Sequence, residues 1–186
     1  DPLTQRDFYG LYAFYHNVPE SGVGTYAANI RRNTPPFLKL PAPEAEAKLV
    51  GTELWLVLIG HGTFDGKEAR FNLRGPDVSA TELAAWLKPV QRPLAIINTT
   101  AASAPFLKAL AGTNRVVITA TRSGYEQSAA RFGGELAKAL ALPAADLDQD
   151  GQTSLLELFL SASAQVAESY KTQGRLLTEH ALLDDN

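Results

Sequence analysis

The chain has 186 residues, of which 45% are hydrophobic and 20% are charged. This length and apolar content are typical of one folded domain, and they exclude intrinsic disorder as the main state. The 17 basic and 20 acidic residues leave a net charge of −3, so the positive surplus that favours nucleic-acid binding is missing. No apolar run approaches the roughly 20 residues of a membrane-spanning helix. Without cysteine, disulfides and thiol nucleophiles are excluded.

The first 50 residues give weak structural signals. An aromatic cluster at residues 8–15 predicts one strand or a short helix, whereas the prolines at 35–43 predict a connection. We therefore treat residues 1–50 as a poorly defined N-terminal segment that can belong to the same domain as residues 51–186. The sequence starts at Asp1 and has no methionine, so we expect a processed or trimmed product, compatible with a lost signal peptide.

From residue 51 onwards, short apolar runs alternate with amphipathic segments. The apolar runs predict buried strands at 54–59, 94–97 and 115–120. Helices are predicted from the capping box of Ser79 and Glu82, and at 105–112, about 125–141 and about 155–172. This alternation predicts an α/β fold, a three-layer αβα sandwich with a mostly parallel central sheet.

A polar turn follows each predicted strand, at residues 60–62, 98–103 and 121–124. The carboxyl ends of parallel strands lie at one edge of a sheet, so we expect these turns to form a site there. His61, between two glycines, is a candidate general base or acid, or alternatively a hydrogen-bonded turn histidine. His16 and His180 have no comparable setting and are expected to be surface or capping residues.

The order of these strand-end motifs resembles the legumain and caspase group of cysteine peptidases. In that group one strand ends in His-Gly, and the next ends in a turn of the form Glu/Asp-Ala-Cys-x-Ser-Gly. His61-Gly62 is similar to the first motif. Aligning the second turn on Ser103 puts Ala101 at the position of the nucleophilic cysteine. The resemblance covers about residues 52–170 and implies a caspase-like fold.

The third turn resembles the substrate-pocket segment of the same group. The resemblance implies substrate-binding roles for Arg122 and Ser123, with Glu126 close by. An arginine in a cleft favours a carboxylate in the ligand. The alternative is that Arg122 forms a surface ion pair.

An alanine at the nucleophile position cannot attack a peptide bond, and three explanations stay open. The chain is a natural pseudo-peptidase whose cleft holds a peptide or protein segment, or Ala101 is an engineered replacement for cysteine. In the third, the hydroxyl of Ser103 or Thr100 is the nucleophile and His61 its base. Neighbouring departures at Thr99, Thr100 and Ala102 favour natural loss over one engineered change.

Residues 146–157 fit the twelve-residue calcium loop of EF-hands, with Gly151 at the sharp turn of position 6. The expected calcium ligands are Asp146, Asp148, Asp150, the carbonyl of Gln152, Ser154 and Glu157. Helices are predicted on both sides of the loop. Thr153 departs from the aliphatic residue usual at position 8, so the loop is expected to stand alone. The alternative is an acidic helix N-terminus, where aspartates interact favourably with the helix dipole.

Three further expectations follow from these motifs. Asp184-Asp185-Asn186 could begin a second calcium loop. Calcium and the lack of thiols favour a place outside the cytoplasm, periplasmic or secreted. The chain could also be a purely structural calcium-binding module of a longer protein. The sequence does not indicate an oligomeric state.

Overall fold

The computed structural model describes residues 52–185 of the chain. The N-terminal segment 1–50, with the aromatic element expected at 8–15, lies outside the described residues. No helix within residues 52–185 has the length and the apolar character needed to cross a membrane.

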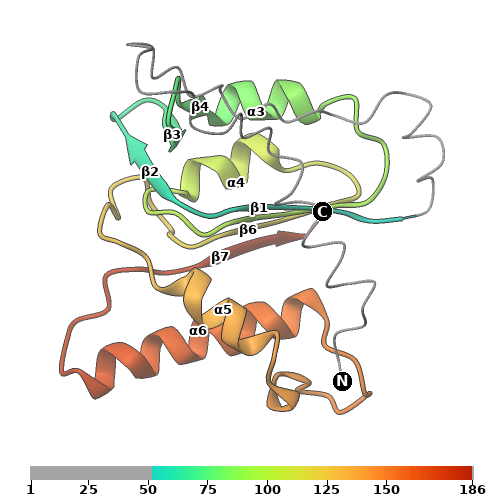
Figure 1. Ribbon diagram of the computed structural model, residues 1–186, viewed down its shortest axis with the longest axis vertical. Coiled ribbons are helices and arrows are strands. Elements are labelled where there is room, and N and C mark those ends of the chain that lie inside the picture. Colours follow the sequence, from blue (N-terminus) through green and yellow to red (C-terminus); the bar gives the residue numbers. More distant parts are fainter. Residues whose placement is uncertain (1–51, 186) are drawn as a thin grey trace, which may run out of the picture. The chain divides into compact units, whose positions relative to one another are not determined.

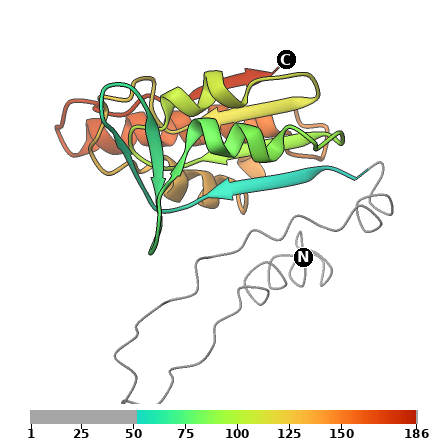
Figure 2. The ribbon, with the colours of Figure 1, turned by 90° about the horizontal axis from the view of Figure 1, so that it is seen from above.

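The larger sheet has four strands in the order β1-β5-β6-β7 (Figures 1 and 2). These are β1 (Leu54–Leu58), β5 (Leu94–Asn98), β6 (Arg115–Thr119) and β7 (Leu182–Asp185). The first three strands run parallel, with Leu56 opposite Ile96 and Ile96 opposite Val117, whereas β7 is antiparallel to β6. The fold is therefore mixed α/β with a mostly parallel sheet, as predicted.

Helices cover both faces of this sheet (Figure 1). One face carries α3 (Ala80–Leu87) and α4 (Ala104–Leu110), and the other carries α5 (Phe132–Ala139) and α6 (Leu155–Thr172). All five residues of β5 are buried because apolar clusters fill the space on each side of the sheet. The predicted capping box starts α3: the Glu82 N–H donates to Ser79 Oγ at 3.1 Å, and the Ser79 N–H donates to the Glu82 carboxylate at 2.9 Å.

A second, antiparallel sheet was not predicted from the sequence. It consists of β2 (His61–Phe64), β3 (Ala69–Asn72) and β4 (Val78–Ser79), in that order. Asp65 organises the connection between β2 and β3, since its Oδ1 accepts the N–H groups of Lys67 and Glu68 at 2.8 Å. His61 therefore begins a strand instead of lying in a free turn.

Two features differ from what the sequence suggested. The helix expected at about 125–141 spans only Phe132–Ala139, because the Glu179 carboxylate accepts the N–H groups of Arg131 and Phe132 and fixes the helix start there. The acidic residues Asp184 and Asp185 lie in β7, opposite Val117 and Val116, so they do not begin a second calcium loop.

Candidate functional site

The ends of the three parallel strands are joined by hydrogen bonds. Thr99 donates to the Leu58 carbonyl through both its N–H, at 3.0 Å, and its hydroxyl, at 2.9 Å. The Ala120 N–H donates to the Asn98 carbonyl at 2.9 Å. The turns that follow β1, β5 and β6 therefore lie side by side at one edge of the sheet.

Strand β2 packs directly against the turn after β5. A Cβ added to Gly62 would lie 2.5 Å from Thr100 Oγ1 and would also overlap the carbonyl of Ala101. Gly62, the residue that follows His61 in the chain, is therefore in close contact with Ala101. His61 is exposed, and its ring forms no hydrogen bond with any residue from 52 to 185, whereas Ala101 is buried.

The two hydroxyls considered as nucleophiles are buried and bonded elsewhere. Ser103 Oγ accepts the Thr121 N–H at 3.2 Å and lies 3.2 Å from Thr121 Oγ1. The Thr100 hydroxyl donates to Asn98 Oδ1 at 2.8 Å. A nucleophile needs an adjacent base to remove its proton, and neither hydroxyl is hydrogen-bonded to His61 within the described part of the chain.

These contacts belong to a buried polar network at the strand ends. Its members, each buried, are Asn98, Thr99, Thr100, Ser103, Thr119 and Thr121. The network continues to Ala102, whose φ of 54° lies in the left-handed region and whose N–H donates to the Glu126 carbonyl at 2.8 Å. A residue other than glycine keeps a left-handed conformation only where surrounding contacts hold it, so contacts within the fold fix the backbone of this turn.

The predicted substrate-binding residues are bonded mainly to one another. Glu126 accepts the Arg122 N–H at 3.0 Å and lies 3.3 Å from Arg122 Nε, an ion pair between an exposed arginine and a half-buried glutamate. Ser123 Oγ accepts the Tyr125 N–H at 3.1 Å. Glu126 also lies 2.7 Å from Nδ1 of His180, a half-buried residue that the sequence did not connect with this region. Glu126 and His180 are 54 residues apart in the chain, so no local sequence pattern indicates their contact.

The loop at 146–157 brings three carboxylates together. Oxygen atoms of Asp146, Asp148 and Glu157 all lie within 4.8 Å of one another. Asp146 also accepts the N–H groups of Asp150 at 3.2 Å and Gly151 at 3.0 Å, which curls the loop around its first residue. Gly151 has a φ of 88°, a conformation that other residues rarely adopt. This acidic cluster could hold a metal ion.

Glu157 closes the loop from the start of α6. Its carboxylate accepts the Ser154 hydroxyl and N–H, both at 2.7 Å, and the N–H groups of Leu147 at 2.7 Å and Asp148 at 3.2 Å. The pKa of Glu157 is lowered to about 2, first by the Ser154 hydroxyl and then by these backbone donors. The carboxylate is therefore charged and fixed beside Asp146 and Asp148 at neutral pH.

Two other predicted ligand side chains, those of Asp150 and Ser154, have hydrogen-bond partners of their own in the loop. Asp150 is exposed and accepts the N–H of Gln152 at 2.7 Å, while Ser154 forms the capping box of α6 with Glu157. Helices lie on both sides of the loop, as predicted. Helix α6 follows it directly, whereas α5 ends at Ala139 and the short 3-10 helix Pro143–Ala145 precedes the loop.

Comparisons with known proteins give no relative. No family model, no curated protein and no solved structure matches this chain.

Proposed function

We propose that the chain is a catalytically silent caspase/legumain-like domain that holds a peptide or protein segment and is stabilised by calcium. The resemblance of the motif order supports this kinship, and so does the close approach of the β2 backbone at Gly62 to the turn that carries Ala101. A methyl group at position 101 supplies no nucleophile. The peptide segment would lie at the strand ends, near His61 and Arg122.

The surroundings of the two candidate hydroxyls support catalytic silence. The Ser103 and Thr100 hydroxyls are engaged with Thr121 and Asn98, so activation by His61 would first require breaking buried hydrogen bonds. The alternative of a serine or threonine hydrolase therefore has less support. An engineered replacement of cysteine at position 101 remains an alternative, since it is compatible with the same geometry.

The acidic loop carries the calcium part of the proposal. Calcium takes about six to eight oxygen ligands, and carboxylates are the commonest side chains among them. The carboxylates of Asp146, Asp148 and Glu157, which lie within 4.8 Å of one another, would repel each other without a cation. Because calcium at useful concentration and the lack of thiols fit a place outside the cytoplasm, we also infer a periplasmic or secreted location.

Thermal unfolding of the full chain tests calcium binding. Relative to a chelator, millimolar calcium should raise the melting temperature by about 5 °C or more, because the ion binds only the folded loop. Asp148→Asn should remove most of the shift. Glu168→Gln, which removes an exposed carboxylate from α6 outside the loop, should retain it. An equal melting temperature with calcium and with chelator would contradict the proposal.

Hydrolysis of a peptide-ester panel tests the catalytic part. The wild-type chain should show no activity above that of His61→Ala, and Ala101→Cys should show a low, thiol-dependent activity. Wild-type activity that depends on His61 would instead support the hydroxyl nucleophile. Calcium stabilisation without activity in Ala101→Cys would favour the alternative of a purely structural calcium module.

A further inference from the structure

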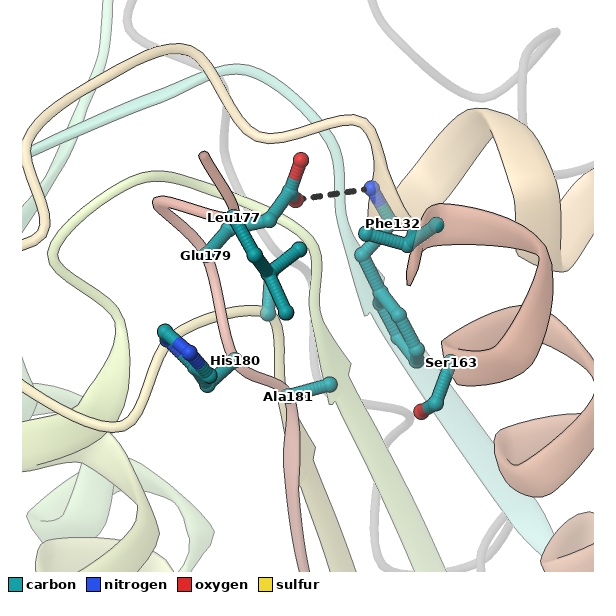
Figure 3. A pocket seen from close by; sticks show the side chains of 8 residues that line it. Phe132, Ser163, Leu177, Glu179, His180 and Ala181 are labelled. Atoms are coloured by element: carbon teal, nitrogen blue, oxygen red, sulfur yellow. Dashed lines mark hydrogen bonds between the residues drawn. The ribbon is translucent and has the colours of Figure 1, made fainter. Parts of the chain in front are cut away.

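A groove of about 650 Å³ lies along the edge of the larger sheet at which the parallel strands begin, opposite the edge with the strand-end turns. It differs from the smaller cavity of about 200 Å³ between α5, α6 and the segment before β7 (Figure 3), where Phe132 is 1% exposed and Ser163 Oγ is buried. In the groove, by contrast, Trp55 is 42% exposed, and Glu53 and Asp185 are exposed as well. The groove therefore presents aromatic and charged groups that a ligand can reach, and its size is typical of ligand sites.

The floor of the groove is one row of residues across the four strands. Trp55 of β1 pairs with Ala95 of β5, and Val116 of β6 pairs with Ala95 on one side and with Asp185 of β7 on the other. In each strand, the residue two positions away packs in the apolar cluster under α5 and α6. Side chains alternate between the two faces of a strand, so all four side chains of the row share the face that these helices cover. Leu155, at the start of α6, lines the groove from the helix side.

The two ends of this row carry the aromatic and charged groups, and its middle is apolar. The Trp55 indole N–H donates to the Glu53 carboxylate at 3.0 Å, which holds a negative charge beside an exposed aromatic ring. Asp185 supplies a carboxylate at the other end. Arg115 also lines the groove, but its guanidinium donates to backbone carbonyls of α3 and α4, which cover the opposite face of the sheet. The carboxylates and the aromatic ring therefore make the groove complementary to positive charge.

We propose that this groove binds a linear aliphatic diammonium ion, with one ammonium on the Trp55 ring beside Glu53 and the other on Asp185. The methylene chain would lie over Val116 and Leu155, which are half-buried. Three strand spacings of about 4.8 Å separate the backbones of Trp55 and Asp185 by about 14 Å. An extended diamine of about eight carbons, with nitrogens roughly 11 Å apart, matches this span when each ammonium lies slightly inside its partner.

Titration of the full chain with octamethylenediamine at low salt tests the site. The chain has two tryptophans, so Trp86→Phe leaves Trp55 as the single fluorescent reporter. We expect a Kd on the order of 1 mM, with octylamine and putrescine about 5-fold weaker and the uncharged octanediol without saturable binding. Asp185→Asn should weaken the diamine about 5-fold and change octylamine by less than about 2-fold, because a single ammonium occupies the Trp55 end. The matched control Asp148→Asn removes a carboxylate of the acidic loop and should change neither ligand.

Amide chemical shifts of the wild-type chain locate the ligand even if a variant fails to fold, since the diamine should shift the amides of Ala95 and Val116. A blocked peptide with two lysines separates the two sources of the ammonium groups. Peptide binding as tight as that of the diamine indicates a protein segment, and weaker peptide binding indicates a free small molecule. Equal affinities for the diamine and octylamine, or loss of diamine binding in Asp148→Asn, would overturn the proposal. Measurements in chelator keep this result independent of calcium.

Discussion

The imidazole of His180 and the carboxylate of Glu126, 54 residues apart in the sequence, are joined by a 2.7 Å contact between Nδ1 and Oε1. The His180 N–H also donates to Glu126 Oε2 at 3.2 Å, and the Glu126 carbonyl accepts the Ala102 N–H at 2.8 Å. Glu126 holds the turn after β5 through its backbone carbonyl, and through its carboxylate it joins the loop after β6 to the segment before β7. This one residue therefore connects three segments near the candidate peptide-binding region.

Removing the Glu126 side chain should destabilise the protein. Glu126→Ala leaves the N–H groups of Arg122 and His180 without their acceptor, and we expect the free energy of unfolding to fall by about 2 kcal/mol. Glu126→Gln keeps one oxygen acceptor and should lose less. Urea unfolding at pH 7 measures both values. The control Glu168→Ala, at an exposed position on α6, should change the free energy of unfolding by less than about 0.5 kcal/mol. If Glu168→Ala lowered it as much as Glu126→Ala does, the stabilising role assigned to Glu126 would be contradicted.

Glu179 should be a second stabilising position, because it fixes the start of α5. Glu179→Ala removes the acceptor of the Arg131 and Phe132 N–H groups and should lower the free energy of unfolding by about 3 kcal/mol. Tyr170→Phe removes the hydroxyl that donates to Glu179 and also contacts Thr178 Oγ1, and it should cost about 1 kcal/mol. In the double variant the two losses should be less than additive, as measured by urea unfolding. Full additivity would show that the two residues do not interact.

The sequence predicted the elements whose signals are local. The apolar run of β5 and the capping box of Ser79 and Glu82 each depend on neighbouring residues, and both were predicted correctly. The same is true of α6, which spans Leu155–Thr172 as expected. The acidic side chains of the loop at 146–157 are also close in sequence. Their grouping in space follows from one tight turn at Gly151.

The sequence did not predict the features that depend on distant partners. Strand β2 is short and mostly polar, so it resembles a loop until it is paired with β3. Strand β7 contains Asp184 and Asp185, which favour a loop in isolation, yet it pairs with β6 at the edge of the sheet. The contact of His180 with Glu126 has the same origin, because only the folded chain brings these residues together.

Acid should destabilise the protein partly through Glu157. The pKa of Glu157 is lowered from 4.5 to about 2, chiefly by the Ser154 hydroxyl, and the pKa of Glu82 is lowered by Ser79. A carboxyl group with a lowered pKa contributes stability that is fully present above its unfolded value and is lost as the pH falls through the folded value. We therefore expect the free energy of unfolding, measured in chelator, to fall between about pH 5 and pH 2.

The variant Ser154→Ala isolates the Glu157 contribution to this acid sensitivity. It removes the hydroxyl that donates to Glu157 at 2.7 Å, so the pKa should move back toward its ordinary value. The decline in stability below pH 5 should then be shallower than in the wild type. Ser161→Ala, whose hydroxyl contacts Gln165 and no carboxylate, should retain the wild-type slope. Identical slopes for Ser154→Ala and wild type would contradict the assigned cause.

Adjacent glycines at the start of α5 should respond oppositely to alanine. A Cβ at Gly133 would lie 2.8 Å from the Cβ of Thr99, whose hydroxyl joins β5 to β1, so Gly133→Ala should destabilise by about 1–3 kcal/mol. At Gly134 such a Cβ has no atom within 4 Å among residues 52–185, the backbone of its own helix apart. There alanine lowers the entropy of the unfolded chain, and Gly134→Ala should stabilise by about 0.5–1 kcal/mol. Thermal unfolding compares the pair. The two positions differ in that only Gly133 packs against Thr99. Melting-temperature shifts of the same sign for both variants would therefore contradict this packing of α5 against the end of β5.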